Sequence, residues 1–166
     1  LSQLEEDIQK GDIEFEEFEI EDLIDSAIKI CKERACTKNI TVEFTFEPNI
    51  IANVNIPLMQ QVLVNLIDNA IRYSNKDGSI DIGLSQNKND IIIKLQDYGI
   101  GIPKEHLLNI FKRFYRVDKS RNRQTGGSGL ELSIVKSVID AHKGQIIVES
   151  IPNQGTTFII YLSKSC

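Results

Sequence analysis

The stretch Gln60–Ser74, QQVLVNLIDNAIRYS, decides the fold of this chain. Pro57 stands just before it, and proline is well placed in the first turn of a helix because that turn needs no donor from its nitrogen. Apolar residues then recur at helical spacing: Leu63, Leu66, Ile67 and Ala70. This pattern predicts a helix over Leu58–Tyr73 with one buried face.

A second face of the same helix carries polar side chains. Asn65, Asn69 and Arg72 (or Tyr73) are spaced so that they share this face. Neutral amide oxygens suit Mg²⁺ that already has phosphate ligands, because Mg²⁺ takes few protein groups. The alternative is that Asn69 and Asp68 are solvated residues of a polar helix face, and spacing alone leaves both interpretations open.

Periodicity predicts further elements on both sides of this helix. The first ten residues are typical of the end of a helix, and those after Gly11 of an extended connector. The other expected elements are a helix at 20–38, strands at 40–47, 50–54 (a partner of the previous strand), 79–86 and 90–96, a helical turn at 104–110, a helix at 129–142, and strands at 145–150 and 156–162. Together they predict an α+β fold, a two-layer α/β sandwich with a mixed sheet of about five strands and helices on one face.

Composition sets limits on the function. The chain has 166 residues and a net charge of -5, which argues against non-specific binding to nucleic acid or anionic membranes. No apolar run is long enough to span a bilayer. Three cysteines at spacings that match no metal motif favour a reduced setting. The sequence starts at Leu1 rather than Met, so we expect a fragment of a longer protein.

Residues 96–103, QDYGIGIP, follow an apolar strand. Asp97 at the strand end is able to accept a hydrogen bond from an exocyclic amine, and Gly99 and Gly101 would let the backbone approach a planar ring. Many ordinary strand-to-helix turns have the same composition, so this motif alone leaves a structural turn as the alternative.

Residues 110–124, IFKRFYRVDKSRNRQ, combine three aromatic residues with six cationic ones. The cations would reach a polyphosphate, or the run is a solvated basic loop anchored by its aromatic residues. Residues 125–136, TGGSGLELSIVK, place glycines before a helix start, where backbone N–H groups bind phosphates. Residues 112–128 have few apolar side chains and predict a mobile flap.

In this order, the four motifs resemble the ATP-binding catalytic domain of sensor histidine kinases, a branch of the gyrase/Hsp90/MutL-type ATPase superfamily. The resemblance runs from Phe18 to Leu162 and includes the ending GQIIVESIPNQGTTFIIYL. It implies a Bergerat-type fold, with ATP between the helices and a flexible ATP lid. Residues 1–18 would be the tail of an upstream dimerisation helix and a connector, and residues 19–166 the catalytic domain.

The resemblance also implies roles for single residues. Asn69 resembles the Mg²⁺-binding asparagine, and Asn65 lies one turn earlier on the same face. Arg72 and Tyr73 match a phosphate-contacting basic residue and an aromatic beside the base. Asp97 matches the aspartate that receives the adenine amino group. Asn65, Asn69 and Arg116 are the expected catalytic residues, and the remaining expected ATP contacts are Gly99, Gly101, Ile102, Phe114, Gly127, Gly129 and Leu130, with Phe111 and Phe114 as lid anchors.

Asn65 and Glu131 depart from the patterns of the superfamily. ATP-hydrolysing relatives carry a glutamate where this chain has Asn65, which cannot accept a proton, so phosphoryl transfer to a protein is favoured over hydrolysis. Glu131 replaces a glycine of the lid pattern. A carboxylate about 4 Å from a phosphate charge costs about 4 kcal/mol at an effective dielectric near 20, against a helix-dipole gain of about 0.3–1 kcal/mol. A degenerate, non-catalytic nucleotide-binding or docking module is therefore the alternative, unless Glu131 turns to solvent.

The resemblance further implies partners. Neither His106 nor His142 lies in the family's acceptor context, so the phosphorylated histidine belongs to an upstream dimerisation domain. A response regulator would receive the phosphoryl group, and the intact protein would be a homodimer. This domain itself would contact neither nucleic acid nor membrane, as the cytoplasmic portion of a membrane-anchored sensor.

Overall fold

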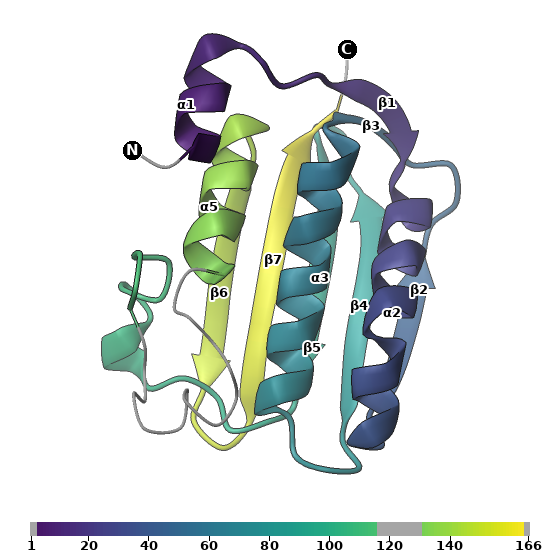
Figure 1. The fold of residues 1–166 in the computed structure, drawn as a ribbon. Helices are drawn as coiled ribbons and strands as arrows, with labels where there is room; N and C mark the ends of the chain where they lie inside the picture. Colours follow the sequence, from purple (N-terminus) through teal and green to yellow (C-terminus); the bar gives the residue numbers. More distant parts are fainter. Residues whose placement is uncertain (1–2, 116–130, 165–166) are drawn as a thin grey trace.

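The computed structural model describes residues 3–115 and 131–164, and in these ranges a layer of helices packs on one face of a five-stranded sheet (Figure 1). The sheet has the order β2-β4-β5-β7-β6. Its strands are β2 (Thr41–Phe46), β4 (Ser79–Gln86), β5 (Asp90–Asp97), β6 (Gln145–Ile151) and β7 (Gly155–Ser163). The helices are α1 (Gln3–Lys10), α2 (Ile20–Thr37), α3 (Ile56–Tyr73) and α5 (Glu131–Ala141).

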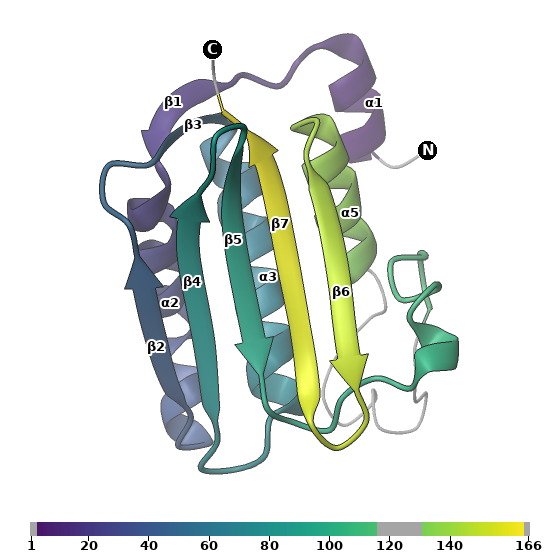
Figure 2. The ribbon, with the colours of Figure 1, turned by 180° about the vertical axis from the view of Figure 1, so that it is seen from behind.

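The sheet is mixed, as the sequence predicts. β2 pairs with β4 in parallel, and every other neighbouring pair of this sheet is antiparallel. Alternation of buried and half-buried residues along β4, β5 and β7 turns one set of side chains toward the helices. Figure 2 shows the opposite face of the sheet, on which none of the described helices lies. The predicted two-layer α/β sandwich is confirmed.

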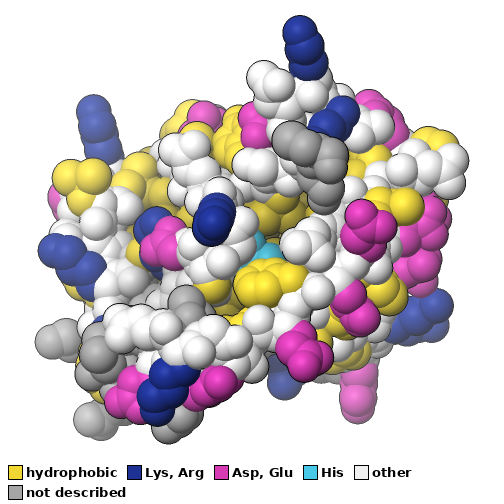
Figure 3. All heavy atoms as spheres, turned by 90° about the horizontal axis from the view of Figure 1, so that it is seen from above, with side chains coloured by type: hydrophobic (Ala, Val, Ile, Leu, Met, Phe, Trp, Pro, Cys, Tyr) yellow, Lys and Arg dark blue, Asp and Glu magenta, His cyan; other side chains and the backbone are white. Residues whose placement is uncertain are grey.

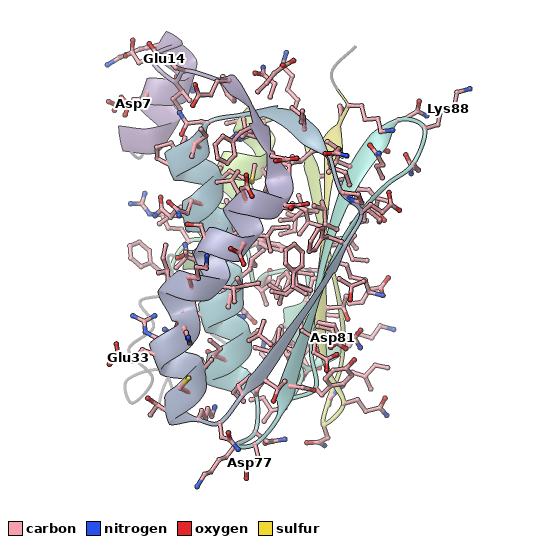
Figure 4. All side chains as sticks on the ribbon, turned by 90° about the vertical axis from the view of Figure 1, so that its right-hand side faces the viewer. Asp7, Glu14, Glu33, Asp77, Asp81 and Lys88 are labelled. Carbon is pink, nitrogen blue, oxygen red and sulfur yellow. The ribbon has the colours of Figure 1, made fainter. Side chains whose placement is uncertain are left out.

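Helix α3 lies between α2 and α5 in the helical layer (Figure 1). It begins where the side chain of Asn55 accepts a hydrogen bond from the Leu58 N–H group, 3.0 Å away, an N-cap that sequence reasoning did not identify. Its buried face packs into the core between helices and sheet, where Figure 4 shows closely spaced side chains. The buried residues of α3 are Met59, Val62, Leu63, Leu66, Ile67, Ala70 and Ile71.

The predicted partner of the strand near residue 50 is wrong. Strand β3 (Ile51–Val54) does not pair with β2 but forms a separate two-stranded sheet with β1 (Glu16–Glu19). Residues 16–19 read EEFE, and glutamate is depleted in strands, so the sequence favours an extended connector there. Pairing with β3 and the contact of Phe18 with the core outweigh that preference.

Smaller differences concern element ends. The helical turn expected at 104–110 is a 3₁₀ helix, η1, only over Lys104–His106. The helix expected from residue 129 is described from Glu131 onward. Within the described residues, no helix is long and apolar enough to cross a membrane, and Cys31 and Cys36 are free thiols.

Candidate functional site

The carboxylate of Asp97 stands at the end of β5 with only 3% of the residue exposed. Its Oδ1 atom accepts hydrogen bonds from the N–H groups of Gly99 (3.0 Å) and Thr156 (3.3 Å). Burial raises the pKa of Asp97, and these two hydrogen bonds oppose the rise. Both of these hydrogen bonds go to Oδ1, and among the described residues no completely buried side-chain oxygen lacks a partner, so Oδ2 retains some exposed surface and is able to accept a hydrogen bond.

Gly99 packs against the end of α3. A Cβ atom at this position would lie 2.0 Å from the carbonyl oxygen of Tyr73, so only glycine fits. The next residue, Ile100, donates its N–H group to the same Tyr73 oxygen at 3.2 Å. Gly101 is tightly packed too, with Ile151 as its neighbour. The observed reason for both glycines is therefore close backbone packing, whereas the sequence argument gave approach to a planar ring.

The turn between β6 and β7 closes the other side of the loop at residues 97–103. Gly155 has φ +125°, and a Cβ atom there would lie 2.0 Å from the carbonyl oxygen of Asp97. The hydroxyl of Ser150 accepts a hydrogen bond from the Ile102 N–H group at 2.7 Å. Sequence reasoning did not identify Ser150, Gly155 or Thr156 as site residues. The only feature of the sequence that could have indicated them is the run ESIPNQGTT, a strand–turn–strand pattern with glycine before threonine.

The polar face predicted on α3 is present. Asn65 and Asn69 are half-buried on this helix, one turn apart. Arg72 donates to the Asp68 carboxylate at 3.2 Å, and Arg34 of α2 binds the other oxygen of that carboxylate at 2.6 Å. Asp68 is thus ion-paired, which corrects its interpretation as a merely solvated residue.

Lys38 completes the end of α3. Its ammonium group donates to the carbonyl oxygens of Ile71 (3.0 Å) and Arg72 (2.9 Å), which the helix itself leaves unpaired. Burial lowers the pKa of Lys38. The end of α3 that carries Tyr73 is therefore held in place from both sides, by Lys38 and by the loop that follows Asp97.

The segment after Pro103 contains both predicted lid anchors, Phe111 and Phe114. Phe111 packs edge-on against Phe158 of β7, with ring centres 6.2 Å apart. Phe114 is 64% exposed, and the guanidinium of Arg113 lies 5.4 Å from its ring centre. Of the two predicted anchors, Phe111 is the one that packs against the core.

The remaining predicted contacts lie outside the described residues: Arg116, Gly127, Gly129 and Leu130, with the side chain of Glu131. In the described ranges, no group of three or more His, Cys, Asp or Glu residues could hold a metal ion. Amide oxygens such as that of Asn69 are compatible with a cation that brings phosphate ligands with it.

The family of the chain follows from its sequence match. Residues 54–165 match the family of histidine kinase-, DNA gyrase B- and HSP90-like ATPases. The chain belongs to this family. Within it, the resemblance to sensor histidine kinases is confirmed, because curated relatives at about 40% identity are sensor kinases.

Sensor protein SrrB of Staphylococcus aureus is 40% identical over 133 residues, covering 80% of this chain and 23% of the relative. Signal transduction histidine-protein kinase ArlS of Staphylococcus haemolyticus is 39% identical over 148 residues, covering 89% of this chain and 32% of the relative. The chain therefore spans less than a third of the length of these curated relatives. It corresponds to the ATP-binding catalytic domain of a sensor histidine kinase.

Solved structures agree with this assignment. The catalytic domain of histidine kinase ThkA superposes with a TM-score of 0.81 at 29% identity, covering 92% of this chain and 97% of that domain. The mycobacterial sensor histidine kinase MprB gives a TM-score of 0.78 at 26% identity, covering 92% of this chain and 99% of that one. ThkA has also been solved in complex with the response regulator protein TrrA, and that match has a TM-score of 0.74 at 28% identity, covering 91% of this chain and 42% of the ThkA chain.

Proposed function

We propose that this domain binds ATP with Mg²⁺ and transfers the γ-phosphoryl group to a histidine on a dimerisation domain outside the sequence. The observation that carries the proposal is Asp97, a buried carboxylate at the end of β5 with one oxygen that accepts no hydrogen bond from the described residues. In a buried carboxylate with a purely structural role, both oxygens are usually hydrogen-bonded. A free acceptor in this position is suited to an exocyclic amine, the group that adenine presents.

The base would be held by the loop at residues 97–103. The carboxylate of Asp97 would accept from the amine, and the hydrogen bonds from Gly99 and Thr156 hold that carboxylate in a single orientation. Ile102, which packs against the core, would cover the ring. Gly99, Gly101 and the Tyr73 backbone shape this loop, and the Tyr73 ring would lie beside the base.

The phosphates would extend along the polar face of α3 toward the start of α5. Asn69 would contribute an amide oxygen to Mg²⁺, and the ion supplies charge neutralisation for the phosphate oxygens. Arg72 would contact the phosphates, and its ion pair with Asp68 would then be weakened. From the segment outside the described residues, Arg116, Gly127, Gly129 and Leu130 would complete the lid, together with Phe114 at its described edge.

Transfer rather than hydrolysis is favoured by Asn65. An amide cannot act as a general base for water, so the attacking group comes from the acceptor protein. The acceptor would be a histidine of a dimerisation domain joined through α1 and the residues 11–15 that follow it. Residues 1–18 would then be its tail and connector, and residues 19–166 the catalytic domain.

The partners of the intact protein follow from the same proposal. A response regulator would take the phosphoryl group, which the complex of ThkA with TrrA supports. The dimerisation domain would make the intact protein a homodimer. We propose that this domain is the cytoplasmic portion of a membrane-anchored sensor, as its similarity to sensor kinases suggests.

Glu131 supports a second candidate, a non-catalytic nucleotide-binding or docking module. Glu131 is the first described residue of α5, and the family pattern has glycine at this position. A fixed carboxylate at this position would repel phosphate. The two candidates differ in phosphoryl transfer.

A mixing experiment separates them. The chain is incubated with the separately produced histidine-bearing domain of its own full-length protein and with ATP labelled at the γ-phosphate. We expect acid-labile label on that domain, lost in Asn69→Ala and kept in Asn53→Ala, a control that truncates an exposed amide on β3. No label from the native chain, but label from Glu131→Gly, would establish the non-catalytic module instead.

A further inference from the structure

The Ser150 hydroxyl on β6 makes three hydrogen bonds at the proposed base-binding loop. It accepts from the Ile102 N–H group at 2.7 Å, and it lies 2.9 Å from both the Gly155 carbonyl oxygen and the Thr156 hydroxyl. The contact with Ile102 joins residues 48 positions apart in the sequence, and the other two contacts are local. Ser150 therefore joins the loop after β5 to the turn between β6 and β7.

The hydrogens in this group can be assigned by counting. A hydroxyl has one hydrogen and two acceptor sites. The Ile102 N–H group occupies one acceptor site, and the Gly155 carbonyl, which only accepts, takes the hydrogen. The Thr156 hydroxyl must then donate to the second acceptor site of Ser150. All three bonds form together only if the Thr156 hydrogen points toward Ser150.

Both ends of this network reach the groups that would bind the base. Through Ile102, Ser150 fixes the end of the loop that begins at Asp97. Through Thr156, whose N–H group donates to Asp97 Oδ1, it fixes the strand that orients the carboxylate. The Asn153 N–H group also donates to the Ile100 carbonyl at 2.7 Å. The turn between β6 and β7 is therefore hydrogen-bonded to the loop after β5 at several positions.

We propose that Ser150 is a positioning residue for the nucleobase, holding the Ile102 side of the loop and the Asp97–Thr156 side at a fixed separation. This inference rests on the proposed nucleotide site. Among the described residues, the Ser150 hydroxyl contacts none of the proposed phosphate-binding groups. Its loss therefore weakens binding of the base and leaves the contribution of the phosphates unchanged. The hydroxyl is essential, because no alkyl side chain is able both to accept from Ile102 and to donate to Gly155.

Threonine and valine provide a matched pair of substitutions. Both are β-branched and suited to a strand, and they differ in the hydroxyl. Adenosine and ATP are titrated separately against the native chain, Ser150→Thr and Ser150→Val, at a temperature where circular dichroism shows every variant folded. We expect Ser150→Thr to bind adenosine within about threefold of the native chain, because this variant keeps the hydroxyl and its hydrogen bonds.

Ser150→Val should lose at least tenfold in affinity for adenosine, and the same factor for ATP, because two backbone groups are left unpaired. If it binds adenosine as tightly as Ser150→Thr does, the inference is wrong. A loss for ATP alone would also contradict it, by placing the effect at the phosphates. Failure of the native chain to bind either ligand would instead refute the proposed function.

Ser150→Val could fail to fold, so Ser150→Ala serves as a second variant. In the folded Ser150→Ala chain, amide hydrogen exchange at Ile102 should accelerate at least tenfold, since this N–H group loses its acceptor. Unchanged exchange at Ile102 would show that Ser150 does not hold the loop.

Discussion

The two ends of helix α3 are built in different ways. At its beginning, Asn55 caps the helix, donates through its side chain to the Glu14 carbonyl at 2.8 Å, and donates its own N–H group to His142 Nε2 at 3.0 Å. At its other end, Tyr73 meets the loop after Asp97, whose carboxylate keeps a free oxygen. Figure 4 shows this separation through its labels, with Glu14 near one end of the molecule and Asp77 near the other.

His142 belongs to the hydrogen-bonded group at the Asn55 end of α3. Its Nδ1–H group donates to the Val138 carbonyl at 2.7 Å while Nε2 accepts from Asn55, so both ring nitrogens have partners. The Phe15 ring packs edge-on against it with ring centres 5.0 Å apart. Figure 3, which looks onto this end, shows a small area of histidine among hydrophobic side chains. At the Asn55 end these polar groups are already hydrogen-bonded to one another. At the other end, the second oxygen of Asp97 is able to accept a hydrogen bond from a ligand.

We call the end of α3 beside Asp97 the open end and the end at Asn55 the closed end. The largest expected effect of a substitution lies at the open end. Gly155→Ala would place a Cβ atom 2.0 Å from the Asp97 carbonyl oxygen in a backbone conformation that favours glycine. We expect a loss of about 3 kcal/mol or more in the free energy of unfolding, together with loss of nucleotide binding. Urea denaturation measures it. Gly83→Ala on β4 is the control, because a Cβ atom there meets nothing within 4 Å. Equal stability of the two variants would show that the close approach is not required.

An intermediate effect is expected at the closed end. Asn55→Ala removes the cap and the bond to the Glu14 carbonyl, and it should cost about 1–2 kcal/mol of stability. Nucleotide affinity, measured by calorimetric titration at a temperature where the variant is folded, should stay within twofold of the native value. A large loss of affinity would mean that the two ends are not independent.

The smallest effect concerns pH. Burial lowers the pKa of His142 from its usual 6.5, and the bond to the Val138 carbonyl opposes the shift. The unfolded chain therefore binds more protons than the folded one below pH 6.5, so this contribution to stability is complete above that pH and decreases as pH falls toward the folded pKa. The slope is at most about 1.4 kcal/mol per pH unit.

Comparison with His142→Gln isolates this contribution. The raised pKa of Asp97 gives a slope of opposite sign from its usual 3.8 upward, and this slope is common to both proteins. The difference in unfolding free energy between the native chain and His142→Gln should therefore shrink as pH decreases from 7.5 to about 5.5. A constant difference would show that the neutral ring is not what holds the closed end.

The sequence predicts the open end better than the closed one. Asp97, Gly99 and the amides of α3 stand in local patterns, next to a strand or at helical spacing, so their places can be predicted without knowing the fold. The cap that Asn55 provides to Leu58 is local, but sequence reasoning did not identify it. The contacts of Asn55 with Glu14 and His142, and that of Phe15 with His142, join segments up to 127 positions apart and have no local pattern. The sequence therefore does not indicate that His142 contacts the start of α3.

The pairing of β3 shows the same limit. Alternation in the sequence places Ala52 and Val54 on a buried face, but it does not say which strand supplies the hydrogen bonds. β1 lies more than thirty residues earlier and carries three glutamates. Likewise, Ser150 on β6 becomes a site residue only because the sheet order places β7 beside β5 and β6 beside β7.

Asp97 gives the most direct test of the central claim, which is that the open end of α3 binds adenine through the free carboxylate oxygen. Asp97→Asn keeps the shape and an oxygen for the Gly99 and Thr156 N–H groups but replaces the free acceptor with a donor. Calorimetric titration of adenosine against both proteins is the measurement. We expect micromolar to millimolar binding by the native chain and a loss of about 10- to 100-fold in the variant, as a hydrogen bond to a charged group is worth about 1.5–3 kcal/mol. Equal affinities in two folded proteins would contradict the claim.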